Sequence, residues 1–472
     1  MKNLKLILFL ISILIFISCN PKEPKLDGIW KSIGYGQLLE INGNQFSLFE
    51  VTDISCLPIL EGDISTQFNS QLDVNNDTLS IKYGINTYYY LRSNNTPSES
   101  TIKLKEKKKK SPMYNLEVLA NNFKDHYVYF ETRGINWDKL YTDTKRKITT
   151  ETTELDLYLI LKDMLKNFND GHVEFEASDS IMILADKIDG VEENTTDDNK
   201  KYISSKEIRK QVAKSYLSDK ISNNKSRVTK WGLSDKNIGY IQINAMMGHA
   251  YFESIDSLKD KAYWDAYFDL ADEMTDESFR NKEIDGLNKT LDSAFKDLYN
   301  TDAIILDVRF NGGGFDEIGM EIMRRFNPIK HEIFTKKAKH GNGFTKINHV
   351  YLERIEKAYT NPVYLLTSKL SASATEIMVL SSLNLKHITR IGGATEGVFS
   401  DMLSKTLPNG WMFSLSNEVY LDNKGNNYEG RGFPVHIDFG YPEERQALYS
   451  YIMQDLEGDK QKILEVMTKN QR

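Results

Sequence analysis

The sequence predicts an α/β protein whose core is a sheet of mostly parallel strands joined by helices, with a helical segment and a small antiparallel β domain before it. The patterns along the 472-residue chain support this in order. Short strands separated by turn residues occupy residues 27–100. Apolar residues at helical spacing follow in 113–177, and buried-strand patterns then alternate with helical ones in 236–442.

The composition is that of an ordinary globular protein of roughly two or three domains. Hydrophobic residues make up 40% of the chain and charged residues 27%. The formal net charge of -7 gives no basic surface of the kind that binds nucleic acid, so no nucleic-acid partner is expected.

Residues 1–19 resemble a bacterial lipoprotein signal peptide. They begin with lysines, and the apolar run 6–17 is too short to span a membrane comfortably. Cys19 follows this run closely, which predicts that it is lipidated after cleavage; an ordinary secretion signal is the alternative. We therefore expect a lipid-anchored protein of the bacterial cell envelope, on the periplasmic face or at the outer membrane, with residues 20–26 as a tether.

Residues 27–100 predict the small β domain. Aromatic and β-branched residues alternate in short runs such as 46–49 and 87–90, and turn residues such as Asn42 and Gly43 separate them. A docking or structural module is the favoured interpretation, with a ligand site as the alternative. The basic segment 101–112 that follows is interpreted as a linker, with contact to anionic headgroups as the alternative.

Residues 113–177 predict the helical part, with Leu116, Leu119 and Phe123 on one helix face. The Asn-Asp-Gly-His sequence at 169–172 ends its second long helix. Residues 178–235 are interpreted as a polar insertion on the surface, because 192–224 is rich in Glu, Asn, Asp and Lys.

The core, 236–442, contains the buried-strand patterns and the helices between them. Strands are predicted at 238–243, 303–308, 363–366 and 388–391, and helices at 291–298, 318–326 and 376–383. The segments 246–287 and 331–358 are interpreted as insertions that shape a substrate cleft, and the second as mostly loop. Residues 443–472 predict one C-terminal helix on the outside.

Ser373 lies where a predicted buried strand turns into a helix. Unpaired backbone N–H groups at a helix start can stabilise a developing oxyanion, so a serine at this turn is placed for nucleophilic chemistry. The alternative is that Ser371 or Ser373 only caps the helix.

Three consecutive glycines, Gly312, Gly313 and Gly314, follow the strand that ends near Asp307. Without Cβ atoms the backbone can turn sharply and direct N–H groups into a cleft. No Lys-Ser/Thr pair follows them, so a phosphate loop is disfavoured. An oxyanion hole fits if a nucleophile lies nearby; a tight turn at the sheet edge is the alternative.

His172 and Glu429 are the candidates for a proton-transfer pair. The chain has 8 histidines, and a neutral imidazole suits proton transfer near pH 7, although a lone histidine is more often structural. Glu429 lies in a turn rich in glycine and could orient an imidazole, or could pair with Arg431 at the surface. No metal-ligand spacing is present in the sequence, and we expect neither a metal nor a cofactor.

Taken together, these blocks resemble the C-terminal-processing (tail-specific) serine peptidase family. The matching blocks, in chain order, are RFNGGG at 309–314, SASATE at 371–376, GGATEG at 392–397, LPNG at 407–410 and EGRGFP at 429–434. The resemblance covers 238–441 well and 114–175 more loosely, and it does not reach the β domain. It implies a ClpP/crotonase-like α/β core.

The family's motifs carry roles onto residues of this chain. The serine of the family's Ser-Ala-x-Glu motif is Ser373 here, which implies that it is the nucleophile. One branch of the family uses a lysine base, but Val398 occupies that position, and valine cannot take a proton. The other branch, similar to the core of tricorn protease, uses a histidine and a glutamate, which map onto His172 and Glu429. The short 178–235 segment, with little room for a PDZ-like domain, also suits this branch.

The resemblance also implies how the reaction proceeds. Ala374 and one of the three glycines, foremost Gly313, would provide the oxyanion hole, and a hydroxyl could connect His172 to Glu429. The chain departs from the family at Gly393, where a glutamate is usual, and at Val435, where an aspartate is usual. We predict a cell-envelope lipoprotein serine endopeptidase that cleaves polypeptides through an acyl-enzyme. The alternative is a catalytically silent relative that binds a peptide or an apolar ligand.

Overall fold

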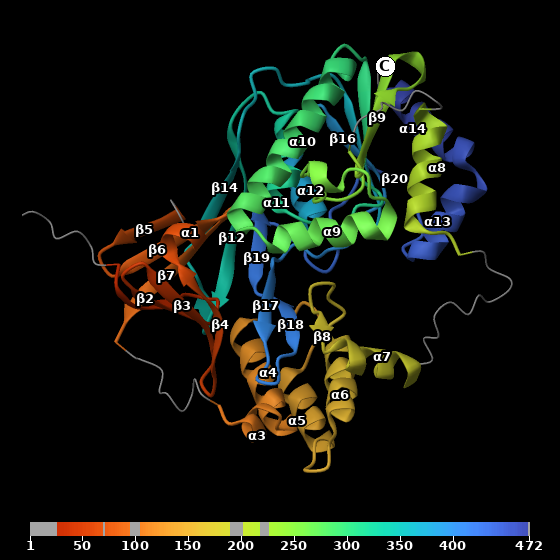
Figure 1. The fold of residues 1–472 in the computed structure, drawn as a ribbon. Coiled ribbons are helices and arrows are strands. Elements are labelled where there is room, and N and C mark those ends of the chain that lie inside the picture. Colours follow the sequence, from red (N-terminus) through yellow and green to blue (C-terminus); the bar gives the residue numbers. More distant parts are fainter. Residues whose placement is uncertain (1–25, 69–70, 95–103, 189–201, 218–225, 471–472) are drawn as a thin grey trace, which may run out of the picture.

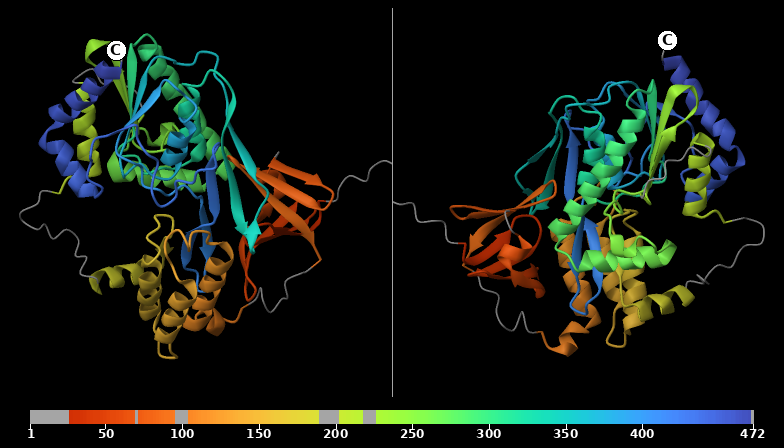
Figure 2. Two further views of the ribbon diagram at one scale, coloured as in Figure 1. Left: turned by 180° about the vertical axis from the view of Figure 1, so that it is seen from behind. Right: turned by 45° about the horizontal axis from the view of Figure 1, so that its top comes forward.

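The computed structural model describes residues 26–68, 71–94, 104–188, 202–217 and 226–470 (Figures 1 and 2). The predicted signal peptide, with Cys19, lies outside these residues, and so does most of the 20–26 tether. Within the described ranges, every helix is either too short or too polar to cross a membrane.

The N-terminal domain is a seven-stranded antiparallel sheet that lies beside the rest of the molecule (Figure 1). Its strand order is β4-β3-β2-β1-β7-β6-β5. Trp30 is fully buried in it, because alternate strand residues face a common apolar cluster. The elements are β1 (Gly28–Ser32), β2 (Gln37–Asn42), β3 (Gln45–Val51), β4 (Cys56–Asp63), α1 (Ile64–Gln67), β5 (Leu72–Asn75), β6 (Thr78–Tyr83) and β7 (Asn86–Ser93).

The helical part packs around the aromatic residues Phe123, Tyr127 and Phe168. Ser111 caps α4 ahead of a proline at its first turn, and Thr153 and Asp156 form a capping box on α6. The elements are α3 (Glu106–Lys109), α4 (Pro112–His126), α5 (Trp137–Lys147), α6 (Glu154–Lys166), β8 (Phe175–Glu176) and α7 (Asp179–Ile188). A three-stranded sheet, β17-β18-β8, joins this part to the core.

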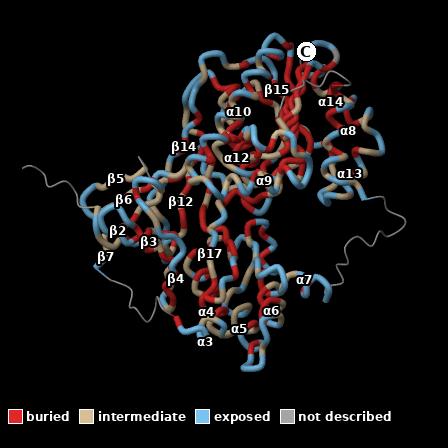
Figure 3. The backbone as a smooth tube through the Cα atoms, viewed as in Figure 1, coloured by how far each residue is buried: buried red, intermediate tan, exposed pale blue. Residues whose placement is uncertain are grey.

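The core sheet has six strands in the order β20-β16-β15-β11-β10-β9, all parallel except β9. Every residue of β10, β11 and β15 is buried, as expected for parallel strands covered on both faces (Figure 3). Helices α10, α11 and α12 pack in one apolar cluster, and α8, α13 and α14 in the other. The predicted α/β fold is therefore confirmed.

The bounds of the remaining elements are as follows: α8 (Ser205–Leu217), β9 (Thr229–Leu233), η2 (Asp235–Asn237), β10 (Ile238–Ile243), η3 (Glu253–Ile255), α9 (Asp260–Asp272), α10 (Asp276–Leu298), β11 (Ala303–Asp307), α11 (Asp316–Arg324), β12 (His331–His340), β13 (Gly343–Phe344), β14 (Asn348–Leu352), β15 (Val363–Thr367), α12 (Ala374–Ser381), β16 (Ile388–Gly392), β17 (Met402–Thr406), β18 (Met412–Ser416), β19 (Glu418–Asp422), β20 (Ile437–Asp438), α13 (Arg445–Gln454) and α14 (Leu456–Asn470).

Three expectations need correction. Residues 205–217 are not a surface insertion, because α8 buries Ile208, Val212 and Tyr216 against the core. The segment 331–358 is not mostly loop: β12 pairs with β14 and β19. The C-terminal segment forms two helices, because the backbone leaves the helical conformation at Asp455.

Candidate active site

Ser373 occupies a sharp turn between the end of β15 and the start of α12. Its φ of 55° and ψ of -128° place a non-glycine residue in a sparsely populated backbone region. Such strain persists only where the surroundings enforce it, and it concentrates at functional sites. Ser373 is half-buried and lines a cavity of about 250 Å³.

Ser371 has a different role from Ser373. It is fully buried, its hydroxyl donates to the carbonyl of Val308 at 2.8 Å, and it accepts from the N–H of Ser368 at 3.1 Å. Its oxygen is therefore committed to holding the turn. Of the two serines considered from the sequence, only Ser373 lines the cavity.

The glycine loop lies directly against Ser373. Gly313 and Gly314 have φ of 111° and 141°, which favour glycine. A Cβ on Gly313 would lie 2.7 Å from the Cβ of Ser373, and one on Gly314 would lie 2.5 Å from the backbone of Met246. The loop therefore needs glycine both for its conformation and for its close approach to the serine.

The predicted oxyanion donors differ in their availability. The N–H of Gly313 donates to Oδ1 of Asn311 at 3.0 Å, so it already has an acceptor. The N–H of Ala374, at the first position of α12, has no acceptor among the described residues. The same is true of Gly312 and Gly314. Ala374 and the neighbours of Gly313 are thus free to donate to a ligand.

His172 follows α6 after a turn in which Asn169 has a φ of 45°. Its backbone N–H donates to Asp170 at 3.0 Å, and its carbonyl accepts from the hydroxyl of Ser414 at 2.8 Å. The imidazole is buried and lies near the backbone of Ser400, which favours the charged form of the ring. Nδ1 of the imidazole has no hydrogen-bond partner among the residues that the structure describes.

The imidazole of His172 favours its neutral form. Burial lowers the pKa of His172 below its usual value, against the opposing effects of Asp170 and the backbone of Ser400. A neutral ring with an unpaired nitrogen can accept a proton near pH 7.

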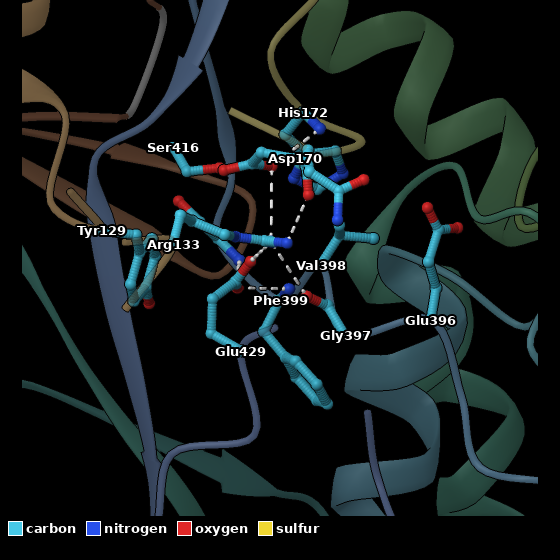
Figure 4. Close-up of polar contacts among 12 residues, drawn as sticks. Tyr129, Arg133, Asp170, His172, Glu396, Gly397, Val398, Phe399, Ser416 and Glu429 are labelled. Atoms are coloured by element: carbon cyan, nitrogen blue, oxygen red, sulfur yellow. Dashed lines mark hydrogen bonds and ion pairs between the residues drawn. The ribbon is translucent and has the colours of Figure 1, made fainter. Parts of the chain in front are cut away.

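Glu429 is buried and does not contact the imidazole (Figure 4). Its Oε1 accepts from Arg133 at 2.8 Å, and its Oε2 accepts from the N–H groups of Phe399 at 2.8 Å and Ser400 at 3.2 Å. Burial, with the nearby charge of Asp170, raises the pKa of Glu429 to about 8, although Arg133 opposes this shift. Arg431 is not its partner; that guanidinium donates to the carbonyl of Asn427.

The backbone of Ser400 lies near both side chains: its N–H donates to Glu429, and it raises the pKa of the His172 imidazole. The hydroxyl of Ser400 does not bridge His172 and Glu429; it donates to the carbonyl of Asp401. Among the residues drawn in Figure 4, Arg133 lies between Glu429 and Asp170 and donates to the carbonyl of Asn169.

Sequence reasoning did not single out Arg133, Asp170 or Glu376. Asp170 was visible in the Asp-Gly-His turn, and Glu376 in the motif that contains Ser373. Arg133 lies in an irregular stretch after α4, and its contact with Glu429 spans 296 residues, so no local pattern marks it. Glu376 is fully buried and accepts the N–H groups of Ser373, Gly397 and Val398.

Ser373 and His172 lie on either side of the Val398 segment. Val398 shares the Oε2 of Glu376 with Ser373, and a Cβ on Gly171 would lie 3.3 Å from Cγ1 of Val398. The structure forms no hydrogen bond between Ser373 and His172. A second cavity of about 500 Å³, lined by Asp170, Gly171 and Val398, opens on the histidine side.

Comparison with known proteins identifies the class. Residues 237–439 match the model of peptidase family S41, and residues 108–166 match the tricorn protease C1 domain. These two matches define a serine-type peptidase. The core of the chain is therefore similar to the peptidases of family S41, and residues 108–166 are similar to the C1 domain of tricorn protease.

One solved structure shows the same fold, and two others are similar at lower TM-scores. A candidate peptidase from Parabacteroides merdae is 22% identical, with a TM-score of 0.53, over 74% of this chain and 97% of its own. Mature CPAF is 11% identical with a TM-score of 0.45, over 74% of this chain and 97% of its own. Tricorn protease is 12% identical with a TM-score of 0.38, over 89% of this chain and 44% of its own.

Proposed function

We propose that this peptidase is an endopeptidase that cleaves polypeptides through an acyl-enzyme on Ser373. The observation that carries the proposal is the strained turn of Ser373 against the glycine loop, with the N–H of Ala374 left without an acceptor. A carbonyl oxygen placed there would meet donors already oriented toward the charge that develops in the transition state.

In the proposed reaction, His172 accepts the proton from Oγ of Ser373 as that oxygen attacks the carbonyl carbon. The imidazolium then gives the proton to the leaving amine, and the acyl group stays on Ser373. Water, deprotonated by the same imidazole, hydrolyses the ester and restores the serine. Ser373 and His172 must approach each other on substrate binding, because catalytic hydrogen bonds often tighten only in the complex.

Glu429 acts in this proposal as a positioning residue. It holds the backbone of Ser400, which lies beside the imidazole, and so would limit the positions that the ring can adopt. Arg133 keeps this carboxylate in place through their ion pair at 2.8 Å.

A fluorophosphonate probe tests the nucleophile. The mature protein should be labelled at Ser373, and Ser373→Ala should lose the label. Thr375→Ser serves as a folded control, because Oγ1 of Thr375 bonds to Asn311 and the serine keeps that hydroxyl. Labelling that persists in Ser373→Ala would contradict the assignment. His172→Gln should slow labelling strongly while leaving the unfolding transition in place.

A non-catalytic relative that binds a peptide or an apolar ligand is the second candidate. The missing hydrogen bond between Ser373 and His172 and the engaged N–H of Gly313 favour it. A well-folded protein that binds peptide but never reacts with the fluorophosphonate would establish this alternative.

We also propose a lipid anchor at Cys19 that tethers the peptidase to the bacterial cell envelope. The support is the order of basic start, apolar run and cysteine in residues 1–19. Mass spectrometry of the mature N-terminus should find a lipidated cysteine. Cys19→Ala should release the protein from the membrane fraction; retention there would contradict the anchor.

A further inference from the structure

A continuous groove leads away from Ser373. The cavity of about 250 Å³ that Ser373 lines is followed by another of about 460 Å³. The two share Tyr83, Tyr88, Asp401 and Met402 in their walls. A chain that reaches Ser373 can therefore extend along these residues.

The N-terminal β sheet forms one wall of this groove. Tyr83 ends β6, and its ring is covered by the guanidinium of Arg280 at 3.7 Å from the ring centre. Asn86, at the start of β7, donates to Asp401 at 2.7 Å. The hydroxyl of Tyr35 donates to Glu418 at 2.6 Å. These contacts join the β domain to the peptidase core, so the wall is a fixed part of the site.

The opposite wall is the free edge of β17. Among the strands of the described ranges, β17 pairs with β18 alone and ends the three-stranded sheet. The N–H of Thr406 points away from β18, to Oε2 of Glu50 at 2.7 Å. By strand alternation, the backbone groups of Met402 and Ser404 also point outward, and their N–H groups have no acceptor among the described residues.

Asp316 provides a carboxyl group beside Ser373. It begins α11 and lines the same cavity as the serine. The other carboxylates there have cations: Lys336 pairs with Asp401 at 3.0 Å and Glu418 at 2.7 Å, and Arg280 with Glu317 at 2.9 Å. Asp316 has no ion pair within the described part of the chain. Burial and the charge of Asp401 raise the pKa of Asp316, although the charge of Lys336 opposes the shift, so this carboxyl favours its neutral form until a cation pairs with it.

We propose that the substrate chain binds in this groove as an extra strand on the edge of β17, with a lysine or arginine side chain placed on Asp316. This inference rests on the proposed function, since it makes the groove the substrate site of Ser373. The free N–H and carbonyl groups of β17 supply sequence-independent hydrogen bonds, and Asp316 supplies the preference for a cation.

Peptide binding to full-length mature protein with Ser373→Ala tests the cation site without needing catalysis. The probes are short fluorescent alanine-rich peptides with a central lysine, and matched peptides with norleucine or glutamate instead. Lysine should bind about tenfold more tightly than norleucine. Adding Asp316→Asn should remove this preference, and adding Asp256→Asn, outside the groove, should not. Equal affinity for lysine and norleucine peptides would overturn the cation site.

A second pair of variants tests the strand addition. Ser404→Pro removes the outward N–H, while Ser404→Ala keeps it. Only the proline should weaken binding of the lysine peptide, by about tenfold. If Ser404→Pro lowers the melting temperature, N-methylated peptides replace it. Two peptides carry backbone methyl groups on alternate residues, one at the odd and one at the even positions (the two registers), and only one of the two should lose binding. Loss in both registers, or in neither, would overturn the strand addition.

These outcomes are separate from the proposed function. Selective binding without fluorophosphonate labelling would keep the groove and overturn the peptidase mechanism. Labelling of Ser373 without any lysine preference would keep the mechanism and overturn the cation site.

Discussion

Ser373 and Val398 are held by the same oxygen atom. The N–H of Ser373 donates to Oε2 of Glu376 at 3.3 Å, and that of Val398 donates to it at 2.7 Å. Glu376 also accepts from Gly397 at 2.8 Å. One buried carboxyl group thus fixes the turn that carries Ser373 relative to the segment that leads to Ser400.

Glu376 should make stability depend on pH. Burial raises its pKa to about 7, so the carboxyl binds a proton more tightly in the folded than in the unfolded chain. The contribution of Glu376 to the free energy of unfolding is fully present below about pH 4.5. It is lost as the pH rises to 7, a change of about 3 kcal/mol. Glu376→Gln, followed by urea unfolding at several pH values, should flatten this decline.

Part of the decline should remain in Glu376→Gln, because the pKa of Glu429 is raised in the same direction. Glu332→Gln, a substitution of a surface carboxylate, is the control. Its free energy of unfolding should decline with pH as steeply as that of the unmodified protein. An unchanged slope in Glu376→Gln would show that Glu376 is ionised in the folded protein.

Ser373→Gly should stabilise the protein while abolishing its labelling by fluorophosphonate. Glycine adopts a φ of 55° without the penalty that serine meets, which we expect to be worth about 1 kcal/mol. Ser373→Ala removes the same hydroxyl but keeps the strain, so it is the matched control. Thermal unfolding of both should rank glycine above alanine; the reverse order would mean that the turn is not strained.

Gly313→Ala should disrupt the glycine loop. The new Cβ would lie 2.7 Å from the Cβ of Ser373 and 3.0 Å from the carbonyl of Ala372, at a φ that favours glycine. We expect a loss of about 2 kcal/mol in the free energy of unfolding and loss of labelling. Gly312→Ala is the control, because its Cβ would meet nothing within 4 Å. Equal stability of the two variants would contradict this account.

Arg133→Met should be strongly destabilising. It would remove the guanidinium that donates to Glu429 and pairs with Asp170, and leaving one member of a buried ion pair uncompensated costs about 3–5 kcal/mol. Arg431→Met, which changes an exposed arginine, should shift the free energy of unfolding by less than about 0.5 kcal/mol. Urea unfolding measures the free energy of unfolding of both variants. A mild effect of Arg133→Met would show that the guanidinium of Arg133 does not stabilise Glu429 and Asp170.

The rate at which the fluorophosphonate labels Ser373 should fall on the acid side with a midpoint below the ordinary pKa of histidine, about 6.5. This fall is the acid limb of the pH profile. Because burial lowers the pKa of His172, the ring stays neutral and able to accept a proton at lower pH than a free imidazole. Asp170 opposes this shift, so Asp170→Asn should move the limb further down. The labelling rate of Ser373 across pH 4–8 measures it, and a limb above 6.5 would remove His172 as the base.

The core sheet could be predicted because its strands carry contiguous apolar residues between helical patterns. Helix α8 was missed because Ile208, Val212 and Tyr216 lie in a segment with abundant charge. Strand β12 was missed because its sequence is rich in charged residues, which usually indicate a surface loop. One of them, Lys336, is only 3% exposed and forms buried ion pairs with Asp401 and Glu418.

The candidate site also has parts that the sequence could predict and parts that it could not. Ser373 and the glycine loop are local in sequence, and the motifs around them indicate the turn and the glycines. Arg133, Asp316 and the β-domain wall come from distant segments, and only the folded chain shows that they meet. The roles of His172 and Glu429 stay predictions, because the structure places Glu429 on Arg133 and on the Ser400 backbone.

The buried lysine network between the β domain and the core has a consequence for how substrates arrive. Buried hydrogen bonds and ion pairs hold the β domain against the core, and separating the two would expose these polar groups to water. The residues involved are Lys336, Asp401, Glu418, Tyr35 and Asn86. A hinge at this seam is therefore costly, and the passage to Ser373 keeps its width. Binding of an extended, unfolded stretch of polypeptide along this passage is therefore favoured over closure of the two bodies around a folded one.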